Sequence, residues 1–380
     1  MSIIPSQKVV KPVIKKNQPD DSFKFQPLPK PTGRYPYQLN LSDIVPNLST
    51  HKLVFHMAGD TGGIKSPQFQ QLIASEMAQQ YQAAHDEDDK PKFLFHLGDI
   101  VYHFGEAEQY YNQFFKPYSV YPVPIFAIAG NHDSDVNTLN PKPYSSLEAF
   151  NQVFCAKEPK EVPFSGGALR KSMVQPNIYW SLNTPLATII GLHSNVPKFG
   201  IVTFEQRDWF VETLIKADHE RPDKAVIVCI HHAPYSADIN HGASIPMINF
   251  LDGVFMETGI KPDIVLSGHV HNYQRFSKNY SDGSTVPFIV CGAGGFDELH
   301  SLALTTDPNF TTDNPLFDDV VLDAFSESKH GFLKISLEKT SEGLTLTGSY
   351  YTIPHEERPD PDATSLLADE FVLELGEAVK

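Results

Sequence analysis

Cysteine is scarce in this sequence. The chain of 380 residues contains three cysteines, Cys155, Cys229 and Cys291, and their spacing shows no pairing pattern. This scarcity excludes a disulfide framework and favours a reducing compartment. Because Cys229 and Cys291 lie in apolar, strand-like runs, we predict that they are small buried core residues.

Long apolar runs are also missing. No stretch approaches the length of a membrane span, so we expect no membrane partner. The first residues lack the apolar core of a signal peptide and are interrupted by prolines. Together with the few cysteines, these features predict a cytoplasmic location.

Positive charge is in deficit, with a formal net charge of −16. We therefore expect no stable complex with nucleic acid, because the chain offers no overall basic field. A small anionic substrate remains compatible with this charge, since bound metal ions would reverse its local sign. The apolar content of 41% and charged content of 20% are those of a globular protein. The oligomeric state stays open.

The composition divides the chain into three parts. Residues 1–49 hold eight prolines and seven basic residues against three acidic ones, which predicts an N-terminal extension that wraps the domain surface or is partly disordered. A basic docking arm is the alternative. Residues 50–354 are predicted to form the catalytic domain. Residues 355–380 form an acidic tail in which Phe371, Val372 and Leu373 predict a closing strand or helix.

The middle of the chain alternates between two periodicities. Apolar residues spaced by three and four predict helices, short β-rich runs predict strands, and the Asp282-Gly283 pair predicts a hairpin turn. The order of these elements predicts mixed sheets with helices outside, while residues 296–328 fit no element. Strands are expected at 53–58, 93–97, 124–129, 178–182, 187–192, 225–230, 264–267, 273–276, 286–291, 332–337 and 344–351, and helices at 67–84, 106–115, 145–154, 204–216 and 244–256.

Five short motifs each follow a predicted strand. Ligands collect at the carboxyl ends of strands in open α/β sheets, and glycines let the chain turn there. Each motif alone is more often an ordinary turn or a polar strand edge, but that alternative would have to hold five times in order. The motifs are Gly-Asp-Thr-Gly at 59–62, Gly-Asp-Ile-Val-Tyr at 98–102, Gly-Asn-His-Asp at 130–133, Val-Cys-Ile-His at 228–231 and Gly-His-Val-His at 268–271.

These side chains suit a pair of metal ions. Asp99 is the natural bridge, because one carboxylate can hold two cations about 3.5–4 Å apart. One ion would take Asp60, Tyr102 and His271 with Asp99, and a tyrosinate favours a trivalent metal, most plausibly Fe(III). Packing under the loop is the alternative role of Tyr102. The other ion would take Asn131, His231 and His269 with Asp99, a set that suits divalent Zn, Fe or Mn.

The five motifs resemble the metal-binding set of the calcineurin-like metallophosphoesterases, and specifically of the purple acid phosphatases. Asp60-Thr61-Gly62 and the Tyr102 of Gly-Asp-x-x-Tyr are the features of that branch, and 204–210, 268–275 and 291–295 are also similar. The resemblance covers roughly residues 50–352. It implies an α/β fold of the metallophosphoesterase type, a four-layer sandwich of two mixed β-sheets flanked by helices.

The resemblance also implies roles for further histidines. His132 resembles the family's substrate-facing histidine, with a supporting role behind the ligands as the alternative. His241 resembles a second such histidine, or is an ordinary loop residue. His232 competes with His231 for one ligand position, and the motif spacing favours His231. His103 and Arg275 support the site or pack elsewhere, and His56, His96 and His193 are expected to be structural. The chain departs from the family in lacking a visible secretory signal and the N-terminal β-domain of the large plant enzymes.

The expected reaction is hydrolysis of a phosphate monoester by attack of a metal-bound hydroxide. Neither a Gly-x-Ser-x-Gly elbow nor a reactive-cysteine setting is present to supply a protein nucleophile. A phosphodiesterase with the same two metals is the alternative, since pocket shape alone separates the two. A non-catalytic scaffold with the same fold is the third possibility, and loss of ligand residues would favour it.

Overall fold

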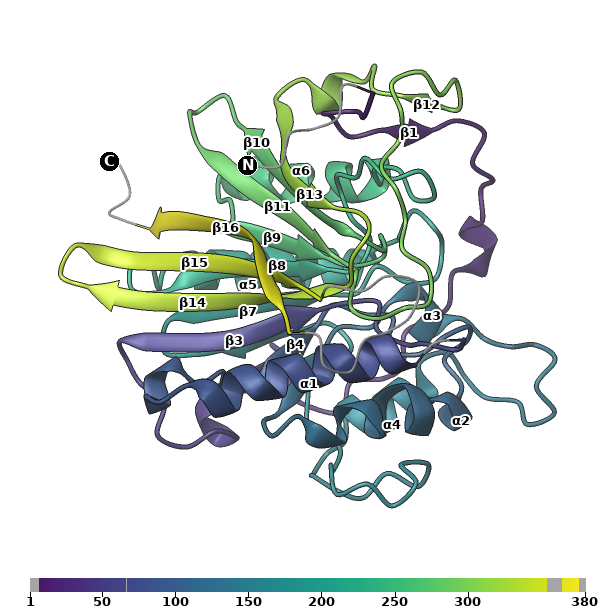
Figure 1. The fold of residues 1–380 in the computed structure, drawn as a ribbon, viewed down its shortest axis with the longest axis vertical. Coiled ribbons are helices and arrows are strands. Elements are labelled where there is room, and N and C mark those ends of the chain that lie inside the picture. The colour runs from purple at the N-terminus through teal and green to yellow at the C-terminus, as the bar shows by residue number, and fades with distance from the viewer. Residues whose placement is uncertain (1–6, 66, 354–363, 376–380) are drawn as a thin grey trace.

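Two β-sheets stacked face to face form the centre of the molecule, and helices cover their outer faces (Figure 1). The structure, a computed structural model, describes residues 7–65, 67–353 and 364–375. The predicted architecture of two mixed sheets flanked by helices is confirmed.

The first sheet has eight strands within the described ranges. Its four central strands, β11, β9, β8 and β7, run parallel to one another. They are almost entirely apolar, as expected for strands covered on both faces. The spatial order is β13 (Val320–Ser326), β10 (Tyr273–Asn279), β11 (Thr285–Cys291), β9 (Ile264–Ser267), β8 (Ala225–Ile230), β7 (Ala187–Leu192), β6 (Trp180–Asn183) and β2 (Gln38–Asn40).

The second sheet has six strands among the described residues. Strands β3, β4 and β5 are parallel, and an antiparallel set of β14, β15 and β16 extends the sheet from β3. The carboxyl ends of β3, β4 and β5 therefore meet at one edge. The spatial order is β16 (Leu366–Leu375), β15 (Gly343–Thr352), β14 (Gly331–Thr340), β3 (Lys52–Ala58), β4 (Leu94–His96) and β5 (Ile125–Ala127).

Three apolar clusters hold the four layers together. Side chains of both sheets, such as Phe55 on β3 and Ile227 on β8, are fully buried in the cluster between them. A second cluster joins the first sheet to α5 and α6, and a third joins the second sheet to α1 and α4. The helices are α1 (Gln68–Ala83), α2 (Ala107–Tyr110), α3 (Asn131–Ser134), α4 (Glu148–Phe154), α5 (Phe204–Asp218) and α6 (Ile245–Thr258).

The predicted strands and the hairpin are confirmed, whereas two predicted helices are partly wrong. In the range 106–115 the α-helix ends at Tyr110 and a π-helical turn continues to Phe115. That turn buries Gln113, whose side chain bonds both the N–H and the C=O of Tyr102, at 2.9 and 2.7 Å. The helix expected from residue 145 begins only at Glu148, because Leu147 adopts a left-handed backbone with φ of 61°.

The segment 296–328, which fitted no predicted element, extends one edge of the first sheet. It contributes β12 (Phe310–Thr311), a short 3-10 turn at Pro315–Phe317, and β13, which pairs antiparallel with β10. Strand β12 pairs with β1 (Ile14–Lys15) from the N-terminal part of the chain (Figure 1).

The described parts of the N-terminal and C-terminal segments contact the central sheets. Residues 7–49 cross the surface, bury Val9 and Val13, and add β2 to the first sheet. In the acidic tail the apolar patch forms β16, so the closing element is a strand. Residues 355–363 and 376–380 of the tail lie outside the described residues. The domain boundaries after residues 49 and 354 stay a prediction.

All three cysteines are buried and unpaired, as predicted for Cys229 and Cys291. Among the described residues, no helix combines the length and the apolar character needed to cross a membrane.

An ion pair joins the two sheets at one edge. Arg275 on β10 donates to Asp369 on β16 from Nε at 2.7 Å and from Nη2 at 3.1 Å, and the Tyr273 hydroxyl donates to the same carboxylate at 2.7 Å. This contact gives Arg275 a structural role in holding the sheets together.

We predict that Asp369→Ala lowers the free energy of unfolding by about 2 kcal/mol, because the half-buried guanidinium loses the carboxylate that binds Nε and Nη2 and keeps only the longer pair of Nη1 with Asp323 at 3.5 Å. Chemical denaturation measures the change. Asp223→Ala is the matched control, since it removes an exposed pair with Lys339 and should lower the free energy of unfolding much less. Equal losses in the two variants would contradict the proposed role of Asp369.

Candidate metal centre

The five motifs lie together at one edge of the two sheets. Each follows the carboxyl end of a parallel strand: β3, β4 and β5 in the second sheet, and β8 and β9 in the first. Main-chain hydrogen bonds connect the loops, with Gly59 N donating to Cys291 O at 2.9 Å and Asp60 N donating to Gly98 O at 2.9 Å. Stacking of the sheets therefore brings residues more than 200 positions apart into one site.

Glycine is required where the loops touch. A Cβ on Gly130 would lie 2.1 Å from Asp99 Oδ1, and a Cβ on Gly268 would lie 2.5 Å from Asp60 Oδ2. The carboxylates thus approach the backbone at these two positions more closely than a residue with a side chain would allow. Asp60, Asp99 and His269 themselves adopt left-handed backbone, with φ of 57°, 53° and 68°. Such strain in non-glycine residues is concentrated at functional sites.

The first group of side chains surrounds the Tyr102 hydroxyl. That oxygen lies 3.2 Å from Asp60 Oδ1, 3.1 Å from Asp99 Oδ2 and 3.2 Å from His271 Nε2. All four side chains are nearly or fully buried. The structure therefore brings together the four residues predicted for the first ion.

The second group shares Asp99 with the first. His231 Nε2 lies 3.3 Å from Asp99 Oδ2 and 3.1 Å from Asn131 Oδ1, and His269 Nδ1 lies 2.8 Å from the same amide oxygen. Possible ligand atoms of Asp99, His231 and His269 all lie within 4.8 Å of one another. These are the four residues predicted for the second ion.

The imidazoles are oriented from behind. His231 Nδ1 is 2.8 Å from the carbonyl of Leu97, and His271 Nδ1 is 3.0 Å from the carbonyl of Glu298. Each contact fixes the tautomer and leaves Nε2 facing the other site residues. Within the described structure, the buried Nε2 of His269 has no hydrogen-bond partner. Such a donor set, with a buried unpaired imidazole nitrogen, fits metal binding.

Burial and charge shift the titration of the site. Burial raises the pKa of Asp60 and of Tyr102 well above their usual ranges, and lowers that of His269 well below its own. Burial also disfavours the charged forms of Asp99 and His231, but the attraction between these two charges is stronger. The pKa of Asp99 is therefore lowered, and the pKa of His231 rises to about 9. Cations in the site would stabilise the ionised carboxylates and the tyrosinate.

The two histidines predicted to face the substrate adjoin these groups. The ring of His132 packs 4.4 Å from that of Tyr102, and its Nδ1 lies 2.7 Å from the carbonyl of His103. The ring of His241 lies 4.3 Å from that of His269. Both residues are partly exposed, as contact with a substrate requires.

Different contacts distinguish His231 from His232, the two histidines that compete for one ligand position. His231 reaches Asp99 and Asn131, whereas His232 Nδ1 is paired with Ser194 Oγ at 2.6 Å. His232 still packs against His269, with ring centroids 4.3 Å apart. His56, His96 and His193 are buried, in agreement with structural roles.

Three residues of the site escaped the sequence analysis. Phe296 stacks on Tyr102 with ring centroids 4.0 Å apart, and His300 stacks on His271 at 4.3 Å. Both belong to the segment 296–328, whose sequence carries no recognisable element. Asp133 is the last residue of the third motif, and that position was the only signal for it.

Asp133 connects two of the loops. Its buried carboxylate accepts hydrogen bonds from the backbone N–H groups of Ile100 at 3.1 Å, Val101 at 3.3 Å and Gly130 at 2.8 Å. Burial, with the nearby Asp99 charge, raises the pKa of Asp133 to about 7. Asp133 therefore sets the positions of Asp99 and Asn131 without facing the metal groups itself.

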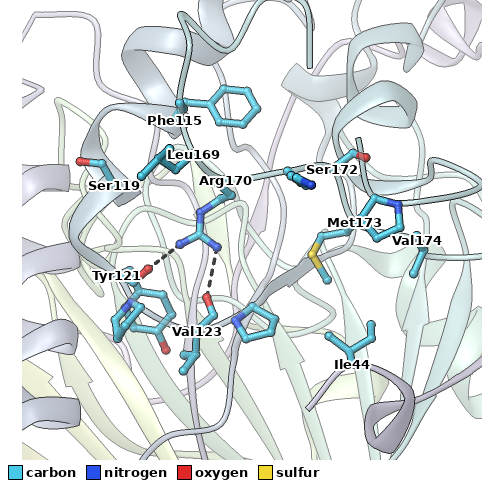
Figure 2. A pocket seen from close by; sticks show the side chains of 15 residues that line it. Ile44, Phe115, Ser119, Tyr121, Val123, Leu169, Arg170, Ser172, Met173 and Val174 are labelled. Carbon is cyan, nitrogen blue, oxygen red and sulfur yellow. Dashed lines mark hydrogen bonds between the residues drawn. The ribbon is translucent and has the colours of Figure 1, made fainter. Parts of the chain in front are cut away.

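A separate cavity of about 570 Å³ lies away from this chemistry (Figure 2). Its lining residues include Arg170, Met173 and Ile44, and none of the nine predicted site residues lines it. The Arg170 guanidinium donates to the carbonyls of Tyr121 at 2.5 Å and Val123 at 3.1 Å. Those bonds tie neighbouring loops together and give Arg170 a structural role.

Comparison with known proteins identifies similar sequences. A sequence model of the family described as "Calcineurin-like phosphoesterase" matches residues 50–273. Purple acid phosphatase 15 of Arabidopsis thaliana is 26% identical over 204 residues, which cover 51% of this chain and 34% of that protein. Probable purple acid phosphatase 20 of the same plant is 28% identical over 179 residues, covering 44% and 35%. The matched region thus spans about a third of these relatives.

One solved structure shows the same fold over most of both chains. It is described as "GAP50 the anchor in the inner membrane complex of Plasmodium" and has 15% sequence identity and a TM-score of 0.52. The match covers 84% of this chain and 90% of that chain. At this identity the similarity concerns the fold alone.

We predict that Asp133→Ala lowers metal content and costs about 2–4 kcal/mol of stability, because three buried N–H groups lose their acceptor. Elemental analysis after metal loading and thermal unfolding measure the two effects. Asp135→Ala is the control, since the carboxylate of this nearby acid is partly exposed, pairs with Lys24 and accepts a hydrogen bond from the adjacent N–H of Val136 without joining separate loops. Full metal content in a folded Asp133→Ala protein would show that the loop contact is dispensable.

Proposed function

Because this chain belongs to the calcineurin-like phosphoesterase family, we propose that it is a dinuclear-metal phosphatase that hydrolyses phosphate monoesters. One observation carries the proposal: two groups of buried donor atoms meet at Asp99, whose Oδ2 lies 3.1 Å from the Tyr102 hydroxyl and 3.3 Å from His231 Nε2. A carboxylate shared in this way is the arrangement that a pair of cations needs.

The donor sets favour two different ions. Asp60, Tyr102 and His271 would hold one ion with Asp99, and a tyrosinate in a set this negative favours Fe(III). Asn131, His231 and His269 would hold a divalent ion, Zn, Fe or Mn, with the same carboxylate. Bound there, two cations supply Lewis-acid binding of phosphoryl oxygens and a water of lowered pKa. The distant similarity to proteins named purple acid phosphatases supports this choice of metals.

The protein's own side chains complete the reaction. His132 and His241 lie beside the two donor groups, and both residues are partly exposed. In the proposed reaction each donates a hydrogen bond to a phosphoryl oxygen, and a histidine passes a proton to the departing alkoxide. Phe296 covers the Tyr102 ring and keeps water away from that side of the site.

A phosphodiesterase is the second candidate, favoured by one feature. A cavity of about 990 Å³ lies between residues 23–30 and 135–146, and Phe104 and Asp135 contribute to its lining. Both residues follow the segments that carry Tyr102 and His132, so the cavity is suited to a second ester substituent. A non-catalytic scaffold is disfavoured because every predicted ligand residue is present and brought together.

We predict that metal-loaded protein releases phosphate from a panel of monoesters faster than it cleaves matched diesters. On the same substrate His132→Ala should lower turnover about 100-fold, because a proton-transferring or hydrogen-bonding group is lost, while metal content stays normal. Preferred cleavage of diesters would support the second candidate. Inactivity on both panels with two metals bound would support the scaffold. Loss of metal in His132→Ala would instead make His132 part of the metal site.

We predict that the iron-loaded, oxidised protein is purple to pink and that Tyr102→Phe is colourless, because a tyrosinate bound to Fe(III) absorbs visible light. Absorption spectra of the two proteins at equal, measured iron(III) content test this. A colourless wild-type protein that contains iron(III) would exclude Tyr102 as a ligand. The site would then be a divalent pair of the wider family.

A further inference from the structure

A short loop carries His241 into the site. We call residues 236–242, between β8 and α6, the histidine loop. The Nδ1 atom of His241 is buried and has no hydrogen-bond partner in the described structure. No hydrogen bond at Nδ1 therefore holds the imidazole, and its position depends on the backbone of the loop and on ring contacts with His269 and His300.

Contacts inside the loop give it a defined turn. The Asp238 carboxylate accepts from the backbone N–H groups of Asn240 and His241, each at 2.7 Å, and Ser236 Oγ donates to the carbonyl of His241 at 2.7 Å. These bonds shape the turn, but they do not set where it lies relative to the metal groups. Contacts from outside the loop must do so.

The N-terminal part of the chain supplies such contacts. We call residues 7–16, which include β1, the N-terminal arm. Val13 is fully buried; its N–H donates to Ser236 O at 2.8 Å, and its carbonyl accepts from Ala243 N at 2.8 Å. A single arm residue thus holds both ends of the histidine loop. The approach is tight, because a Cβ on Gly242 would lie 2.6 Å from the Val13 carbonyl oxygen.

The other edge of the arm is attached to the segment that carries His300. Val9 N donates to Ala303 O at 3.1 Å, and Lys8 Nζ pairs with Glu327 at 3.0 Å and donates to Leu302 O at 3.1 Å. The side chains of Lys8 and Glu327 are 16% and 23% exposed, so the ion pair is largely shielded from water. The arm therefore bonds both segments, which also pair directly with each other: Ile239 N donates to Ser301 O at 3.1 Å and Ala303 N donates to Ala237 O at 2.8 Å. Their imidazoles, His241 and His300, pack against His269 and His271.

We propose that the N-terminal arm is a positioning element of the phosphoesterase site, which fixes His241 so that it contacts the phosphoryl group. The inference rests on the function proposed above. The arm precedes residues 50–273, the region that matches the family, so the device is an addition outside that matched region. Val13 forms hydrogen bonds with the backbone at both ends of the histidine loop, and Lys8 and Val9 attach the arm to the segment that carries His300. These contacts fix the position of the loop.

Gly242→Ala tests the proposal because the added methyl group pushes the loop away from Val13. The variant leaves the His241 side chain itself unaltered. We expect the variant to bind inorganic phosphate at least about tenfold more weakly, by calorimetry on metal-loaded protein, and to lose kcat/KM by a similar factor. Metal content should not change. Gly253→Ala is the matched control, since nothing lies within 4 Å of a Cβ at that position in α6, and it should behave as wild type.

A second comparison separates positioning from general damage. In a His241→Ala background, Gly242→Ala should change phosphate affinity less than twofold, because the group that it displaces is gone. Lys8→Met, which breaks the arm's ion pair without altering the loop, should weaken phosphate binding in the same direction and also act only when His241 is present. Lys8→Met keeps the test decisive if Gly242→Ala does not fold.

The outcomes are distinct. Wild-type phosphate affinity in both arm variants, or equal effects with and without His241, would overturn the arm's role and leave the proposed function intact. Wild-type protein with two metals that neither binds phosphate nor cleaves any ester would overturn the proposed function, and the inference with it.

Discussion

The buried carboxylate of Asp99 is the constraint on which the rest of the site depends. Its Oδ2 lies between the Tyr102 hydroxyl and His231, and its Oδ1 accepts from the backbone N–H of His132 at 2.9 Å. A buried charge is costly unless it is paired and hydrogen-bonded. Asp60 lies close by, and burial raises the pKa of its carboxyl group, so its ionisation would require more positive charge than the protein's own donors supply. Cations are the natural complement, and the family to which the chain belongs uses a two-metal centre.

The close approach of these groups explains the local sequence around them. The glycines at 130 and 268 leave room for the carboxylates, and Asp133 binds the backbone N–H groups of two loops at once. Strained φ angles at Asp60 and Asp99 persist because parallel strands on either side hold the loops. The rigid sheets thus stabilise the strained backbone of the site, and the loops supply its functional side chains.

Predictions from the sequence succeeded where the local residue pattern determines the local structure. The apolar runs before each motif, such as 53–58 and 225–230, form buried strands, and the expected hairpin forms around Asp282-Gly283. The pattern failed where distant contacts decided the backbone. The π-helical turn after Tyr110 is shaped by the bonds of Gln113 to Tyr102, and no local periodicity reveals such a partner.

By itself the sequence determined the family resemblance, the strand-then-motif order and the residue types at the site, because these are local properties of short segments. Only the tertiary structure decided that Asp99 faces both donor groups, that His231 rather than His232 reaches Asn131, and that Phe296 and His300 join the site. It also decided that the N-terminal arm touches the loop of His241. Those contacts join residues far apart in the chain, and their positions follow from the stacking of two sheets.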